Sequence, residues 1–211
     1  MVNFQKYSIF LSDIKLSAND FFSETGSGFE DELESVISAF ASAEAQYGVI
    51  YLTPQEASVF NMGKKISAIF KKAEHVAIFV TTLGRDYISV CQRYRGDPLY
   101  YYLADIIASA LIERCADLAH KKISLYANSI GLKCSNRYSP GYCGWSTSEQ
   151  KILFSLLPPH PCGIKLTESS LMDPVKSISA AVALGEKIRY HNHDCSSCND
   201  ENCLYKKKQI L

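Results

Sequence analysis

The sequence predicts an α+β protein: one domain, residues 1–190, with a mainly antiparallel central sheet flanked by helices, and a Cys/His-containing tail, residues 191–211. Two observations predict this class. Apolar runs of strand length occur at 75–84 and 177–185, and a long segment with helical periodicity begins near Pro98. A third is that 211 residues suffice for one substantial domain, and no internal repeat or low-complexity linker divides them.

The first elements are predicted to be a helix and two strands. Residues 29–48 form an amphipathic pattern that ends at Gly48, with apolar side chains at three- and four-residue steps: Phe29, Leu33, Val36, Ile37 and Phe40. A short strand is predicted at 49–53. The run at 75–84 is rich in β-branched residues and closed by glycine, which is typical of a buried strand.

The longest helix is predicted from near Pro98 to about Tyr126, with Gly131 in the following turn. Its apolar stripe consists of Leu103, Ile106, Ile107, Ala110, Leu111, Cys115, Leu118 and Ala119. This stripe indicates that one side of the helix packs on the core.

The C-terminal third predicts another helix and two strands. A helix is expected from about Thr147, because Ser146 and Glu149 have the spacing of a capping box, and the pair Pro158–Pro159 ends it. Strands are expected at 163–169 and 177–185.

Charge and cysteine content restrict the class of protein. Lys plus Arg and Asp plus Glu both number 22, so the balance argues against broad electrostatic binding of nucleic acid or an anionic membrane. The N-terminus lacks a signal-peptide pattern, and no apolar run is long enough for a membrane helix. The eight cysteines are therefore interpreted as reduced thiols of a cytoplasmic protein.

The loop SNRYSPGYCGW, residues 135–145, concentrates unusual side chains. Pro140 and Gly141 predict a tight turn that lets the backbone approach a ligand closely. Arg137 provides a forked cation for a carboxylate or phosphate, and Tyr142 a planar ring. The loop thus suits a small molecule with an acid group and a planar ring. The alternative is a structural turn whose aromatic side chains pack on the core while Arg137 is solvated.

Together with a second segment, residues 163–180, this loop resembles the activation domain of cobalamin-dependent methionine synthase. In that family an Arg-x-(Ala or Ser)-Pro-Gly-Tyr loop is followed by Leu-Thr-Glu-Ser, Met, Pro and Ser-(Val or Ile)-Ser. The matching residues are Arg137, Ser139, Pro140, Gly141, Tyr142, Leu166, Thr167, Glu168, Ser169, Met172, Pro174, Ser177 and Ser179. The resemblance covers roughly residues 75–185 and weakens in the N-terminal third and the tail.

The resemblance implies a domain that binds S-adenosylmethionine and presents it to a cobalamin carried by another module. In that family, a one-electron reduction by flavodoxin or a similar donor, coupled to methyl transfer from S-adenosylmethionine, converts inactive cob(II)alamin to methylcobalamin. We expect a free-standing activation domain that serves a split methionine synthase or another corrinoid methyltransferase, and that does not make methionine alone.

The resemblance also assigns roles within the loop. Arg137 would hold the ligand's carboxylate through charge-assisted hydrogen bonds. The backbone around Ser139, Pro140 and Gly141 would touch the adenosyl part, and Tyr142 would lie at the edge facing the cobalamin.

Further assignments lie outside the loop. Glu113 is placed where the family has a glutamate that contacts the ligand's amino group; the alternative is an exposed helical residue paired with a neighbouring cation. Glu168 is a candidate contact of the ligand, or a structural residue that accepts backbone N–H groups in its turn. Met172 is interpreted as core packing. The loop departs from the family at Cys143 and Trp145, where the family has proline after the tyrosine.

The tail predicts a metal site. Cys195 and Cys198 have Cys-x-x-Cys spacing and Cys203 follows. The fourth ligand can come from His193, His191, Cys162 or an exogenous group. Zinc and an iron–sulfur cluster both suit these ligands. The alternative is a tail with unligated thiols.

Two other functions compete with the activation-domain hypothesis. One is a metal- or iron–sulfur-bearing redox protein that acts on a corrinoid partner and keeps only a vestigial ligand pocket. The other is a docking subunit that orders a partner and binds no small molecule.

Overall fold

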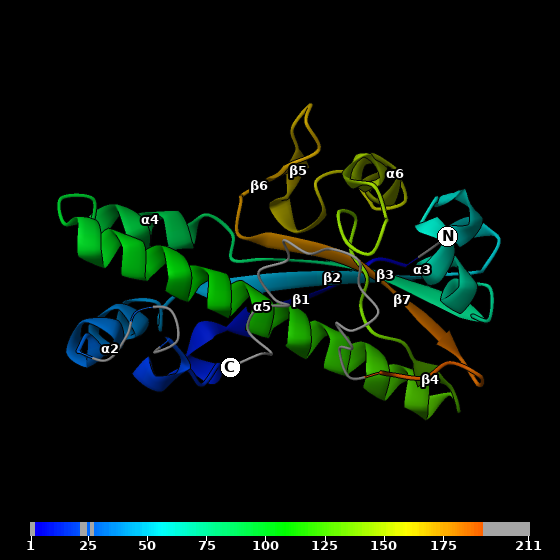
Figure 1. Ribbon diagram of the computed structural model, residues 1–211, viewed down its shortest axis with the longest axis horizontal. Helices are drawn as coiled ribbons and strands as arrows, with labels where there is room; N and C mark the ends of the chain where they lie inside the picture. The colour runs from blue at the N-terminus through cyan, green and yellow to red at the C-terminus, as the bar shows by residue number, and fades with distance from the viewer. Residues whose placement is uncertain (1–2, 22–24, 26–27, 192–211) are drawn as a thin grey trace.

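A five-stranded antiparallel sheet forms the centre of the computed structural model, which describes residues 3–21, 25 and 28–191 (Figure 1). The strand order is β1-β2-β3-β7-β4, and each neighbouring pair is antiparallel. These strands are β1 (Gln5–Phe10), β2 (Glu44–Leu52), β3 (His75–Thr82), β4 (Lys133–Cys134) and β7 (Ser177–Gly185). A separate hairpin pairs β5 (Lys165–Leu166) with β6 (Met172–Asp173). The predicted α+β class with an antiparallel central sheet is confirmed.

Helices lie on both faces of this sheet. The α-helices of the described residues are α2 (Glu30–Ala39), α3 (Gly63–Phe70), α4 (Asp86–Arg93), α5 (Pro98–Ser129) and α6 (Gln150–Ser155). Short 3-10 helices occur at Leu11–Asp13, Ala18–Phe21, Glu56–Val59, Thr147–Glu149 and Pro161–Gly163. Figure 1 shows α5 running diagonally along one face of the sheet, with α3 and α6 away from it. No helix in the described ranges is long and apolar enough to cross a membrane.

Two central strands are buried on both faces, which explains their uninterrupted apolar sequences. Successive side chains of a strand point to opposite faces. Ala180 and Val182 of β7 therefore pack with the α5 layer, whereas Ala181 and Ala183 pack with α3 and Trp145 on the other face. Both predicted strands, 75–84 and 177–185, are confirmed.

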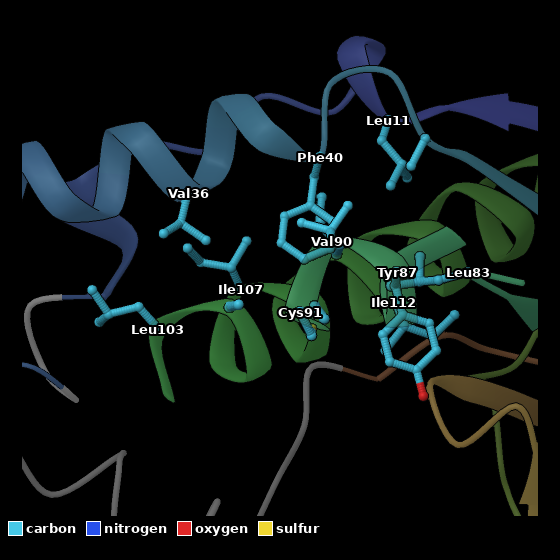
Figure 2. Packing of buried hydrophobic residues seen from close by; sticks show 14 of the residues in the cluster. Leu11, Val36, Phe40, Leu83, Tyr87, Val90, Cys91, Leu103, Ile107 and Ile112 are labelled. Carbon is cyan, nitrogen blue, oxygen red and sulfur yellow. The ribbon is translucent and has the colours of Figure 1, made fainter. Parts of the chain in front are cut away.

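A second part of the core lies where α2 and α4 pack on the first half of α5. Figure 2 shows Phe40, at the end of α2, close to Val90 of α4, and Val36 pointing toward Ile107 and Leu103 of α5. The buried side of α5 thus contacts helices along its first half and the sheet along its second.

The long helix α5 agrees with its prediction. The Asp97 carboxylate accepts hydrogen bonds from the N–H groups of Leu99 and Tyr100 at 3.0 and 3.2 Å, so a side-chain cap starts the helix at Pro98. Its 32 residues span about 48 Å. Of the predicted apolar stripe, Leu118 is exposed, because it lies at the solvent edge of the stripe.

The predicted helix over 29–48 is wrong beyond Ala39. Residues 44–52 form β2 instead, in which alternate side chains, Ala45 and Tyr47 among them, are buried. Gly48 does not end a helix: a Cβ atom there would lie 2.0 Å from the ring of Phe4, so the absence of a side chain makes room for that ring. Pairing with β1 and β3 outweighs the local helical pattern.

Two C-terminal predictions also need correction. The Ser146 hydroxyl accepts from the Ser148 N–H at 3.3 Å, while the Glu149 carboxylate accepts from the distant Asn61 N–H at 2.8 Å, so no capping box forms. The helix there opens with a 3-10 turn before α6. The strand predicted at 163–169 is reduced to β5, since the following residues form a turn.

Candidate ligand-binding site

The segment that follows β4 carries Arg137 along the edge of the sheet. The Ser135 N–H donates to the Ala183 carbonyl at 2.9 Å, and the Tyr138 N–H to the Ala181 carbonyl at 3.0 Å, so this segment stays paired with β7. Between these two bonds the Arg137 side chain reaches α5. The backbone of Arg137 is therefore fixed by the sheet.

Arg137 forms ion pairs with two carboxylates of α5. Its Nη2 donates to Glu113 Oε2 at 2.6 Å, and its Nη1 donates to Asp117 Oδ1. The Arg137 side chain is 22% exposed, against 47% for Glu113 and 59% for Asp117. The structure thus brings together two predicted site residues and adds Asp117. The sequence signal for Asp117 was its place one helical turn after Glu113.

His120 extends this cluster by another turn of α5. Its Nε2 lies 2.8 Å from the Ser135 carbonyl oxygen, so Nε2 carries the proton of the neutral ring. The ring also contacts Tyr190, with centroids 5.8 Å apart. Burial lowers the pKa of His120, and the Arg137 charge acts in the same direction, whereas the bond to Ser135 and the Asp117 charge oppose them.

Asn136, next to Arg137, ties down the end of the described chain. Its side-chain amide donates to the His191 carbonyl at 2.6 Å, and its Oδ1 accepts from the His191 N–H at 2.9 Å. Residue 191 is the first residue of the predicted tail. Both bonds form with backbone groups of His191, which places this point of the chain beside the Arg137 segment.

The turn after Arg137 is closed by its own backbone. The Gly141 N–H donates to the Trp145 carbonyl at 2.7 Å, and the Trp145 N–H donates to the Tyr142 carbonyl at 2.9 Å. Gly141 has a φ of 100°, a value that favours glycine. Pro140 is buried and Ser139 partly buried, whereas the Tyr142 side chain is 56% exposed. The predicted tight turn is present, and its aromatic ring faces solvent.

Trp145, which departs from the family pattern, anchors this loop. Its side chain is 1% exposed and packs edge-on against Phe60, with centroids 5.4 Å apart. Its Nε1 has no hydrogen-bond partner among the described residues. Trp145 belongs to the layer opposite α5, so the loop crosses from one face of the sheet to the other. A Cβ at Gly63 would lie 2.9 Å from the Gly144 carbonyl oxygen, so the start of α3 packs closely against this loop.

Glu168 lies apart from these contacts, in the exposed turn between β5 and β6. The Ser170 N–H donates to the Thr167 carbonyl and the Leu171 N–H to Thr167 Oγ1, each at 3.0 Å. Thr167 thus accepts the backbone N–H groups of this turn, the role that the sequence analysis considered for Glu168. Met172 packs partly buried against the core, as predicted. Figure 1 shows this hairpin projecting beyond the sheet.

The two serines of the second motif have buried partners. Ser177 Oγ donates to the Pro174 carbonyl at 2.7 Å and lies 2.8 Å from Thr82 Oγ1. Gln150 Nε2 donates to Ser179 Oγ at 2.7 Å, which links α6 to β7. These contacts hold the elements around the loop together.

The polar stripe of α5 continues toward its N-terminus. Lys176 Nζ lies 2.8 Å from both Asp105 Oδ1 and Ser109 Oγ. Asp105, Ser109, Glu113 and Asp117 follow at four-residue steps, so two cations from the sheet side bind the same stripe. Shallow depressions of about 430 and 450 Å³ lie elsewhere on the surface, and Arg137 lines neither of them.

The predicted metal ligands Cys195, Cys198, Cys203 and His193 lie outside the described residues. Within the part of the chain that the structure describes, no group of three His, Cys, Asp or Glu side chains could hold a metal ion. Cys162, an alternative ligand, is buried, and this burial raises the pKa of its thiol to about 11.

Comparisons with known proteins identify the family. The family described as "Vitamin B12 dependent methionine synthase, activation domain" matches residues 62–209. A solved structure, "Crystal Structure of the MetH Reactivation Domain bound to AdoHcy", superposes with a TM-score of 0.63 at 14% sequence identity, covering 90% of this chain and 81% of that one. Nothing among the curated proteins matches significantly. The chain belongs to the family of vitamin B12-dependent methionine synthase activation domains.

Proposed function

We propose that the chain binds S-adenosylmethionine at Arg137 and supports the reductive remethylation of a cobalamin held by a partner. One observation carries this proposal: Arg137 and Glu113, a cation and an anion, lie in contact beside a tight turn. The amino-acid end of S-adenosylmethionine carries a carboxylate and an ammonium group, which such a pair can bind. Family membership supports the same ligand, as does the related domain that is described as bound to AdoHcy.

The residues of this site bind and orient the ligand. Arg137 donates from a fork of N–H groups, and its backbone is held along β7, so a carboxylate would meet it at a defined place. Glu113 would face the ammonium. The turn at Gly141 leaves backbone accessible to the adenosyl part, and the exposed Tyr142 ring would face the corrin.

The chemistry requires two partners. The methyl group comes from S-adenosylmethionine and one electron from a donor such as flavodoxin; together they convert cob(II)alamin to methylcobalamin and release S-adenosylhomocysteine. We propose that the cobalamin belongs to a module of methionine synthase or of another corrinoid protein. We also propose a cytoplasmic location, because the four buried cysteines of the described core, Cys91, Cys115, Cys134 and Cys162, are free thiols.

Calorimetric titration of S-adenosylmethionine and S-adenosylhomocysteine tests the ligand. We expect Arg137→Ala to weaken both affinities about 10- to 100-fold, as for a lost hydrogen bond to a charged group. Arg114→Ala is the matched control, since Arg114 pairs with Asp20 at 3.4 Å and not with the site; its affinities should equal wild type. Absence of binding by the wild type at about millimolar ligand would overturn the proposal.

A further inference from the structure

We infer that Asp117 is an internal competitor for the ligand's carboxylate: it pairs with Arg137 Nη1, and the ligand's carboxylate takes this donor in its place. This inference rests on the proposed function and adds a residue that sets the affinity of the same site. It follows from three features of the ion-paired cluster.

The first feature is how the guanidinium is shared. Nη2 donates to Glu113 and Nη1 to Asp117, so each of these two nitrogens already has a carboxylate partner. A carboxylate that binds arginine in the bidentate manner uses two parallel N–H groups of one edge. A ligand carboxylate that takes Nη1 and Nη2 together therefore competes with both side chains.

The second feature is that Asp117 can leave more easily than Glu113. The Asp117 side chain is the more exposed of the two, at 59% against 47%, so its carboxylate is already largely hydrated. The exchange returns the Asp117 carboxylate to water, and the ligand's carboxylate replaces it beside the partly buried Arg137, so neither charge is left buried and unpaired. Glu113 remains to face the ammonium group of the ligand.

The third feature is the charge balance. Arg137, Glu113 and Asp117 together carry a formal charge of one negative unit. A ligand carboxylate would become the third anion beside Arg137, which is 22% exposed, while the ligand's ammonium group pairs with Glu113 and not with Asp117. Departure of Asp117 into solvent removes this like-charge repulsion. Asp117 and the ligand each present one carboxylate, so the exchange keeps the same kind of group on Arg137.

The test is the affinity of Asp117→Asn for two ligands, S-adenosylhomocysteine and 5′-methylthioadenosine. Both are thioethers of adenosine without a sulfonium charge, and only the first has an amino-acid group. We expect Asp117→Asn to bind S-adenosylhomocysteine about two- to fivefold more tightly than wild type, the size of an exposed ion pair. The affinity for 5′-methylthioadenosine should not change.

Asp105→Asn is the matched control. Asp105 lies on the same stripe of α5, is 58% exposed and pairs with Lys176 instead of Arg137. It loses the same charge but frees no donor of Arg137, so both affinities should stay at the wild-type value. Asp117→Ser provides a second variant with the same expected gain.

A double-mutant cycle shows whether Asp117 acts through Arg137. In the Arg137→Ala background, Asp117→Asn should no longer increase the affinity. If the wild type binds S-adenosylhomocysteine and Asp117→Asn binds it equally or more weakly, the competitor role is wrong. If the wild type binds neither ligand, the proposed function itself fails, and the inference fails with it.

Discussion

Arg137 combines properties that a solvated surface arginine lacks. Its backbone follows the paired edge of β7 and its guanidinium contacts two carboxylates of α5. The interpretation of the loop as a plain turn with a solvated arginine therefore does not describe this residue. It does describe part of the loop, because Trp145 and Tyr138 pack on the core. Only Tyr142 among these rings is left exposed.

At the same scale, His120 predicts a pH dependence of stability. Its pKa is lowered in the folded protein, chiefly by burial, from an ordinary value of about 6.5. As pH falls below about 6.5, the unfolded chain takes up a proton that the folded chain resists. The free energy of unfolding should therefore be largest above this pH and decrease toward the lower folded-state pKa. Urea unfolding at several pH values measures it.

His120→Gln is the control for this prediction. A glutamine amide can still donate to the Ser135 carbonyl but does not titrate. The groups around the ring, Arg137, Asp117 and Tyr190, remain. The fall in stability between about pH 7 and pH 5 should be smaller in the variant. Equal pH profiles of the two proteins would contradict the assignment.

At the scale of elements, the loop depends on contacts on both faces of the sheet. Arg137 is held from the α5 side, and Trp145 is held in the opposite layer. The bond between Gln150 and Ser179 then connects α6, just after the loop, to β7. A change in either layer can consequently move the turn at Gly141.

Ser179→Ala tests this connection. It leaves the buried Gln150 amide without its acceptor, and we expect the free energy of unfolding to fall by about 1–3 kcal/mol. The double variant Ser179→Ala with Gln150→Leu removes both polar groups and should recover part of the loss. Urea unfolding gives both values.

Ser155→Ala is the matched control for Ser179→Ala. Ser155 is exposed and its hydroxyl bonds to the Ile152 carbonyl of the same helix, so the effect should stay within about 0.5 kcal/mol. If Ser179→Ala has the same free energy of unfolding as the wild type, the Gln150 amide finds another partner at no cost.

At the scale of the whole molecule, the sequence predicted best the elements whose surroundings are uniform. β3 and β7 are buried on both faces, so an apolar run suffices to recognise them, and α5 carries one continuous stripe with a capped start. The boundary between α2 and β2 was missed because it depends on pairing with β1, far away in the sequence. Local periodicity contains no information about that partner.

The candidate site also divides into features that the local sequence predicts and features that depend on contacts between distant segments. Arg137, from the loop motif, and Glu113, from its position on the long helix, were predicted individually, and their contact required the register between α5 and the β7 edge. That register also selects Asp117 and His120 from the many polar residues of α5. Asp117 has a sequence signal only in its place one turn after Glu113, and His120 has none. Tertiary placement therefore completes the site.

The tail, residues 191–211, gives a prediction of metal content. Cys195, Cys198 and Cys203, with His193, are expected to bind about one zinc ion, or an iron–sulfur cluster, per chain. Metal analysis and a visible spectrum after anaerobic purification measure the content. Cys195→Ser with Cys198→Ser should lose the metal, whereas Cys143→Ser should keep it. A wild-type protein without metal under these conditions would leave the tail with unligated thiols.

Trp145 has a practical consequence, because it is the only tryptophan of the chain. Its indole lies in an apolar layer directly behind the turn at Gly141. Excitation of tryptophan therefore produces emission from a single known position, without any label. A loop that opens would hydrate the indole and shift its emission to the red, while a loop that stays closed would leave the spectrum in place. The intrinsic fluorescence of Trp145 is thus a label-free measure of whether this loop opens when S-adenosylmethionine is added.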